Sequence, residues 1–180
     1  MRLEPSLYLA PPRIGRMTTR RTFLKAGLLG GTLLAVGGLA ALVAGRDPDA
    51  DRRQVLSAVI PAVLEGALPE EPAARAAAVA RCAQGIDTAL AGMPPAARQE
   101  AAQLFALLAI PPSRIALAGV RSSWSDAGTD EVAAFLERWR VHPIALMRSG
   151  YGALHDLTLA AWYADESTWE SIGYPGPLNL

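Results

Sequence analysis

The fold is indicated most clearly by the stretch Thr129-Asp130-Glu131-Val132-Ala133-Ala134-Phe135-Leu136-Glu137-Arg138-Trp139-Arg140. Its large apolar residues recur with the spacing of one face of an α-helix. Thr129 is the predicted N-cap of this helix. Asp130 and Glu131 fall in its first turn, where the positive end of the helix dipole favours negative charge. We therefore predict an amphipathic helix over 130–140 that buries Val132, Phe135, Leu136 and Trp139.

Helical spacing continues on the N-terminal side of this stretch. Residues 52–64 form one predicted helix, which Pro61 should kink or end. A second, alanine-rich helix covers 72–90, and a third starts at Pro94-Pro95, since proline costs little in the first turn of a helix. The predicted buried positions of the last two are Val79, Cys82, Ile86, Leu90, Leu104, Phe105, Leu107 and Leu108.

The chain breaks at Ile110-Pro111-Pro112-Ser113, and Ser113 is the predicted cap of a short segment through Ala118. The last long helix is predicted over 143–163, despite Gly150 and Gly152. No run alternates apolar and polar residues in the way that predicts a β-strand. The sequence therefore predicts an all-α fold, an irregular bundle of about five or six helices after an N-terminal signal helix.

Charge divides the chain into two parts, although the 180 residues together carry no net charge. Residues 1–44 contain six basic side chains and one acidic one, whereas residues 45–180 contain 11 arginines and 16 carboxylates. The basic end is typical of a targeting segment. The acidic remainder argues against nucleic-acid binding, which requires clustered cations to contact phosphates.

The basic end contains the twin-arginine export pattern Thr19-Arg20-Arg21-Thr22-Phe23-Leu24-Lys25. The residues predicted to carry the signal are Arg20, Arg21, Phe23, Leu24 and Lys25. An uncharged segment follows over 26–45, and Arg46 begins a polar stop. This order predicts export to the periplasm. The uncharged segment is long enough to span a bilayer, so both a cleaved signal and a retained membrane anchor are open.

Residues 1–16 contain three prolines and no periodicity, which indicates a disordered prefix or an over-extended start that truly begins at Met17. We therefore divide the chain into a prefix over 1–16, a twin-arginine signal over 17–45 and a helical domain over 46–180.

Residues that commonly carry chemistry are sparse. Cys82 is the only cysteine, so it is either a buried thiol or a thiol available to another chain. His142 and His155 are too far apart in sequence for a metal-binding pair on one helix, and Asp156 is expected on a different helix face from His155. The sequence contains no phosphate-binding glycine loop and no nucleophile elbow. It predicts no catalytic, cofactor-binding or metal-binding residue.

Large aromatic residues gather near the C-terminus at Trp162, Tyr163, Trp169 and Tyr174, followed by Pro175 and Pro177. Tryptophan and tyrosine are common anchors of protein interfaces. This segment is predicted either to fold back on the bundle or to contact a partner.

The leader, the Phe135–Arg140 helix, Trp162-Tyr163-Ala164-Asp165, Trp169 and Gly173–Pro177 resemble the small, gamma-type subunits of bacterial periplasmic dehydrogenases for gluconate, glucose, sorbitol and related sugars or alcohols. The resemblance implies a non-catalytic subunit without a cofactor of its own. Its partners would be a large glucose–methanol–choline flavoprotein that binds FAD, the twin-arginine translocation machinery and a cytochrome c subunit. If the uncharged segment over 26–45 is retained as an anchor, the protein is expected to be membrane-associated. The alternative is a stand-alone periplasmic helical protein that binds a small ligand.

Overall fold

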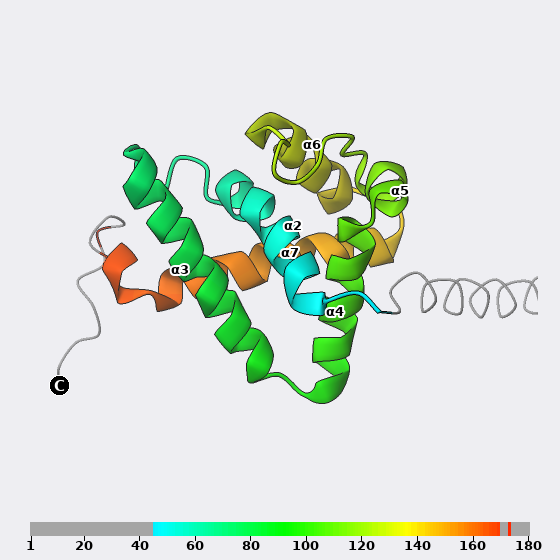
Figure 1. Cartoon of the computed structure of the whole chain (residues 1–180), viewed down its shortest axis with the longest axis horizontal. Helices are drawn as coiled ribbons and strands as arrows, with labels where there is room; N and C mark the ends of the chain where they lie inside the picture. Colours follow the sequence, from blue (N-terminus) through cyan, green and yellow to red (C-terminus); the bar gives the residue numbers. More distant parts are fainter. Residues whose placement is uncertain (1–44, 170–172, 174–180) are drawn as a thin grey trace, which may run out of the picture. The chain divides into compact units, whose positions relative to one another are not determined.

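The computed structural model describes residues 45–169 and residue 173. It contains six α-helices in this range, α2 to α7, and no strand (Figure 1). The predicted all-α class is confirmed. The elements are α2 (Pro48–Val63), α3 (Pro72–Ala91), α4 (Pro95–Ala109), α5 (Pro111–Ser113), the π-helix η1 (Arg114–Ala118), α6 (Thr129–Arg140), α7 (Ala145–Ala164) and the 3-10 helix η2 (Glu166–Thr168).

Prolines in the first turn begin three of the long helices, α2, α3 and α4. The start of α2 lies four residues before the predicted one, because the Asp47 carboxylate accepts the Asp49 N–H at 2.9 Å and Pro48 suits the first turn. Helix α2 continues past Pro61 and ends at Val63. Helix α3 begins where it was predicted to begin.

Three predicted details differ from the structure. Gly128 is the N-cap of α6, and Thr129 is the first helical residue with no capping hydrogen bond from its side chain. Ser113 does not cap the segment that follows it, because its hydroxyl donates back to the carbonyls of Leu107 at 2.5 Å and Ile110 at 3.1 Å. Helix α7 starts two residues after the predicted Pro143, at Ala145.

The core forms around α2, which packs against α3, α4, α6 and α7. Helix α7 also packs along α3 and α6, and it passes behind α2 and α3 in Figure 1. The predicted buried face of α6 is confirmed. On α3 and α4, Val79, Leu104 and Leu107 are only half-buried, whereas the other predicted positions are buried. The buried side chains of α2 and α6 that fill the centre are Val55, Leu56, Val59, Ile60, Val132, Phe135, Leu136 and Trp139.

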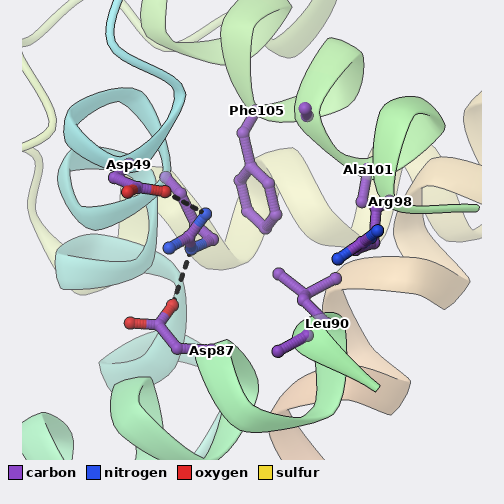
Figure 2. Close-up of a pocket in the computed structure, with 9 residues that line it drawn as sticks. Asp49, Asp87, Leu90, Arg98, Ala101 and Phe105 are labelled. Atoms are coloured by element: carbon purple, nitrogen blue, oxygen red, sulfur yellow. Dashed lines mark hydrogen bonds and ion pairs between the residues drawn. The ribbon is translucent and has the colours of Figure 1, made fainter. Parts of the chain in front are cut away.

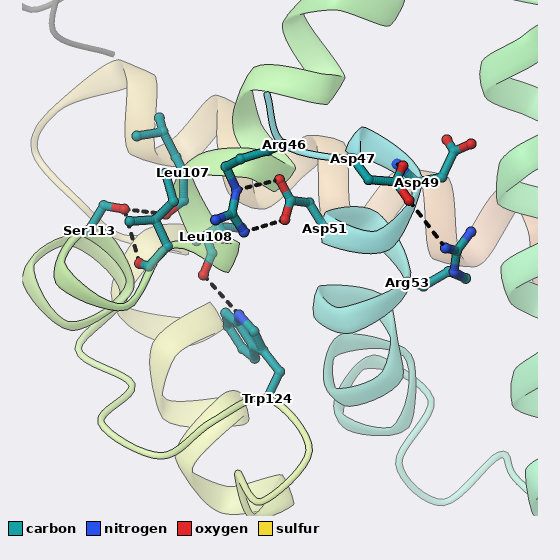
Figure 3. Close-up of polar contacts among 10 residues, drawn as sticks. Arg46, Asp47, Asp49, Asp51, Arg53, Leu107, Leu108, Ser113 and Trp124 are labelled. Carbon is teal, nitrogen blue, oxygen red and sulfur yellow. Dashed lines mark hydrogen bonds and ion pairs between the residues drawn. The ribbon is translucent and has the colours of Figure 1, made fainter. Parts of the chain in front are cut away.

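Two tryptophans join the core to backbone carbonyls. The indole N–H of Trp124 donates to the Leu108 carbonyl at 2.8 Å (Figure 3), and that of Trp139 donates to the Leu117 carbonyl at 2.9 Å. Phe135 lies between them, with ring centroids 6.0 Å from Trp124 and 4.9 Å from Trp139. These contacts attach the irregular segment 110–128 to α4 and α6.

Candidate functional site

Several predicted functional residues lie outside the described part of the chain. They are the export residues Arg20, Arg21, Phe23, Leu24 and Lys25 and the tail residues Tyr174, Pro175 and Pro177. The division of the N-terminal region into a prefix and a signal falls on undescribed residues as well. These assignments stay predictions.

The aromatic residues at the end of α7 divide between core and surface. Trp162 is only 4% exposed and belongs to the core, so little of its side chain is available to a partner. Tyr163 is 53% exposed, and its carbonyl accepts the indole N–H of Trp169 at 2.8 Å. This end of α7 is tied to α3 by an ion pair between Arg81 and Asp165 at 2.9 Å. Among the predicted interface residues that the structure describes, Tyr163 is therefore exposed, Trp169 is half-buried and Trp162 is buried.

Cys82 is the buried thiol of the two predicted alternatives. It is 1% exposed on α3, and its sulfur donates to the Thr158 carbonyl of α7 at 3.6 Å. Burial, with a smaller contribution from the charge of Asp165, raises the pKa of the thiol to about 11. The group is therefore a neutral thiol at physiological pH, and a bond to another chain would require α3 and α7 to separate.

The two histidines have local contacts. The Nδ1 of His142 accepts the Ile144 N–H at 3.1 Å, which stabilises the turn before α7. His155 stacks on Tyr151, and its Nδ1 lies 3.0 Å from the carboxylate of Asp156, the next residue of α7. Within the described residues, no group of three or more His, Cys, Asp or Glu side chains is placed to hold a metal ion.

A cavity of about 210 Å³ lies between α2, α3 and α4 (Figure 2). Arg52 is held there between two carboxylates, Asp87 at 2.6 Å and Asp49 at 2.9 Å. Burial lowers the pKa of Arg52, but the hydrogen bonds to the two aspartates outweigh burial and raise it. Phe105 and Arg98 line the other side. Because the aspartates already neutralise Arg52, we interpret the cluster as a clamp that joins α2 to α3.

A larger and more apolar groove of about 510 Å³ runs between α2 and α3. Leu56, Ile60 and Val79 contribute apolar surface to it, and Arg53 and Arg75 also line it. An apolar groove with a few polar groups is the common form of a small-molecule site. Among the described residues, this groove is the feature that fits the alternative of a stand-alone protein that binds a small ligand.

Five of the six large apolar side chains that are exposed on the described residues lie in η1, in the connection between α6 and α7 and in the first turn of α7. Their exposure was not predictable from the sequence, because an apolar residue in a short irregular segment gives no local sign of whether it is buried. A usable signal was present in residues 138–148, which contain three arginines and no carboxylate. The five side chains are Ile115, Leu117, Val141, Ile144 and Leu146, which are 39–72% exposed.

Among the described helices, none alone is long and apolar enough to cross a membrane; Pro95–Ala109 and Pro111–Ala118 satisfy the length and composition test only as a pair bent by 84°. Comparison of the chain with protein-family models, with curated proteins and with solved structures finds no match.

Proposed function

We propose that this chain is the non-catalytic small subunit of a periplasmic FAD-dependent sugar or alcohol dehydrogenase of the glucose–methanol–choline type. It escorts the large flavoprotein through the twin-arginine machinery and stabilises it after export. The observation that carries the proposal is the pattern Arg20-Arg21-Thr22-Phe23-Leu24-Lys25, followed by 20 uncharged residues. The FAD belongs to the partner, and a cytochrome c subunit is the further partner that would accept electrons.

In this function the helical domain is a scaffold that carries aromatic residues at the C-terminal end of α7. Helix α7 is packed along α3 and α6 and carries Tyr163 on the surface at its C-terminal end, with Trp169 next to it. Aromatic side chains on a well-packed helix provide large contact area at a small cost in conformational entropy. Tyr163 and Trp169 are therefore the described residues that we assign to the contact with the flavoprotein.

The test uses the double variant Arg20→Lys with Arg21→Lys, which keeps the charge of the leader. Lysine lacks the planar guanidinium fork, so recognition that depends on this group should fail. We expect the flavoprotein and its dehydrogenase activity to disappear from the periplasm together with this chain. Arg53→Lys is the matched control, since Arg53 lies on the exposed surface of α2. Unchanged periplasmic activity in the double variant would refute the escort role.

The groove between α2 and α3 favours the stand-alone ligand-binding protein as the second candidate. Purification of a tagged copy from the periplasm separates the two candidates. A yellow complex that contains FAD supports the dehydrogenase subunit. A colourless monomer that carries a small apolar molecule supports the ligand-binding protein, and Val79→Asp in the groove should then release the molecule.

A further inference from the structure

The groove between α2 and α3 combines apolar walls with positive charge. Its described lining residues include two arginines, Arg53 and Arg75, but no carboxylate and no aromatic ring. A groove of this composition matches a ligand that has an aliphatic part and an anionic head. We propose that it binds a linear aliphatic carboxylate, with the carboxylate on the Arg75 guanidinium and the chain along the apolar walls.

Small side chains on α3 leave the groove open. Figure 1 shows α2 and α3 running in opposite directions, and the two helices pack against each other. Leu56 and Ile60 of α2 line the groove and are almost fully buried. The opposite wall on α3 consists largely of alanine, at positions 76, 80 and 83, and alanine has no atoms beyond Cβ to fill the space. The resulting volume of about 510 Å³ is in the range of small-molecule sites.

Arg75 is the cation of this groove that lacks a counter-ion. It is half-buried near the start of α3, and its side chain forms no ion pair or hydrogen bond with the described residues. The Glu71 carboxylate, one turn earlier, is occupied with the N–H groups of Ala73 and Ala74. The guanidinium fork of Arg75 is therefore available to a carboxylate, which it matches in charge and in geometry.

Arg53 is less suited to hold the head of the ligand. Its side chain is exposed, and its guanidinium already lies 3.8 Å from the Asp47 carboxylate. The ion pair of the neighbouring Arg52 with Asp87 places the start of α2 beside the end of α3. Because the helices are antiparallel, Arg53 lies toward the opposite end of the groove from Arg75. We therefore assign the carboxylate to the Arg75 end.

The hydrogen-bonding groups of the groove favour an anion over a neutral or cationic head. Ser57 is the lining hydroxyl, and its hydrogen is donated to the Gln54 carbonyl at 2.8 Å. The remaining side-chain donors are guanidinium N–H groups, and a guanidinium accepts no hydrogen bond. The head of the ligand must therefore accept hydrogen bonds and carry negative charge.

The walls indicate a flexible chain as the apolar part of the ligand. Leu56, Ile60 and Val79 are aliphatic, and the described lining offers no aromatic face on which a ring could stack. Between Arg75 and Ala83, α3 lines the groove over about 12 Å. A linear chain that starts at Arg75 can follow this length of the helix and bury its methylene groups against α2.

This inference goes beyond the dehydrogenase-subunit function, which does not use the groove. It rests on the second candidate function only in naming the class of ligand for the same groove. Binding is measured on the purified chain without the flavoprotein and without export. The export test and the binding test can therefore fail separately.

The experiment is a calorimetric titration of the full chain with dodecanoate, below the concentration at which dodecanoate forms micelles. Dodecanol and dodecyltrimethylammonium have the same chain with a neutral and a cationic head. We expect saturable binding of dodecanoate and at least tenfold weaker binding of the other two. Absence of dodecanoate binding would overturn the proposal, and so would equal binding of dodecanol, since the charge of the head would then be irrelevant.

The assignment of the head is tested with Arg75→Gln, which removes the charge and keeps a side chain of similar length. A hydrogen bond between charged groups is worth about tenfold or more in affinity, so dodecanoate should bind about tenfold more weakly to the variant. Arg98→Gln is the control, because Arg98 is an exposed arginine of α4 that does not line the groove. Equal affinities of the two variants would overturn the role of Arg75.

The place of the chain is tested with two alanines of α3 that are both exposed. Ala80→Leu fills the groove, whereas Ala77→Leu adds the same atoms outside it. We expect Ala80→Leu to abolish dodecanoate binding and Ala77→Leu to leave it unchanged. Circular dichroism of both variants confirms that the helices are intact. If the two variants bind dodecanoate equally well, the chain does not lie in this groove and the proposal fails.

Discussion

Two glycines of α7 should respond in opposite directions to the same substitution. Gly150 is buried against Trp139, and an added Cβ would lie 2.5 Å from Cζ3 and 3.0 Å from Cε3 of the indole. Gly152 is one half-turn away, and the nearest atom to an added Cβ is an Asp156 carboxylate oxygen at 4.0 Å. The pair Gly150→Ala and Gly152→Ala therefore separates packing from helix propensity within one helix.

The magnitudes follow from two opposing terms. Alanine in place of glycine inside a helix stabilises by about 0.5–1 kcal/mol, which is the whole effect expected at Gly152. At Gly150 the overpacked contact with a rigid, buried ring costs about 1–3 kcal/mol and outweighs that gain. The gain in helix propensity is common to both variants, so we expect their free energies of unfolding to differ by the overpacking cost alone, about 1–3 kcal/mol.

Chemical and thermal unfolding of the full chain, followed by circular dichroism at 222 nm, measures this difference. One kcal/mol corresponds to about 3–6 °C in the melting temperature of a domain of this size. Trp139→Phe removes the ring atoms that Gly150→Ala would meet, so the double variant should show a favourable coupling energy. If Gly150→Ala stabilises the chain as much as Gly152→Ala does, the packing of α7 on Trp139 is not as described.

Two further predictions concern α3. Cys82 should resist thiol reagents in the folded chain even at pH 8, because its side chain is buried and its pKa is about 11. In denaturant the same thiol should react at once. Fast labelling without denaturant would contradict the packing of α3 on α7. The Glu71 carboxylate accepts the N–H groups of Ala73 and Ala74, which lowers its pKa from the ordinary value of 4.5. The Glu71 cap therefore stabilises α3 above pH 4.5, and this stabilisation is lost as the pH falls through the lowered pKa. The difference in the free energy of unfolding between the native chain and Glu71→Ala should therefore shrink in acid. A difference independent of pH would show that the charge of the Glu71 carboxylate is irrelevant.

Most of the helices were predictable from the chain because their signals are local. The spacing of Val132, Phe135 and Trp139 indicates both the helix and its buried face, and both are confirmed. Prolines at the first turn also mark where α3 and α4 begin. The choice of capping residue was less predictable. A side chain such as Ser113 can donate to either of two neighbouring segments, and the positions of those segments decide which one it binds.

Tertiary structure decided which apolar and aromatic side chains are hidden. Trp162 and Tyr163 are neighbours with similar sequence signals, yet α3 and α7 bury one and expose the other. The exposure of Leu146 likewise depends on the absence of another described element over the start of α7. Burial is a property of the whole arrangement, and residues far apart in sequence contribute to it.

The sequence by itself determined the helical class, the presence of each long helix and the export pattern at Arg20-Arg21, because each depends on residues within a few positions of one another. Only the tertiary structure decided that η1 and α7 both contact Trp139 of α6. The physical reason is that a surface is formed by segments that meet in space, and the packing of a buried ring against a glycine of another helix has no signature in local sequence spacing.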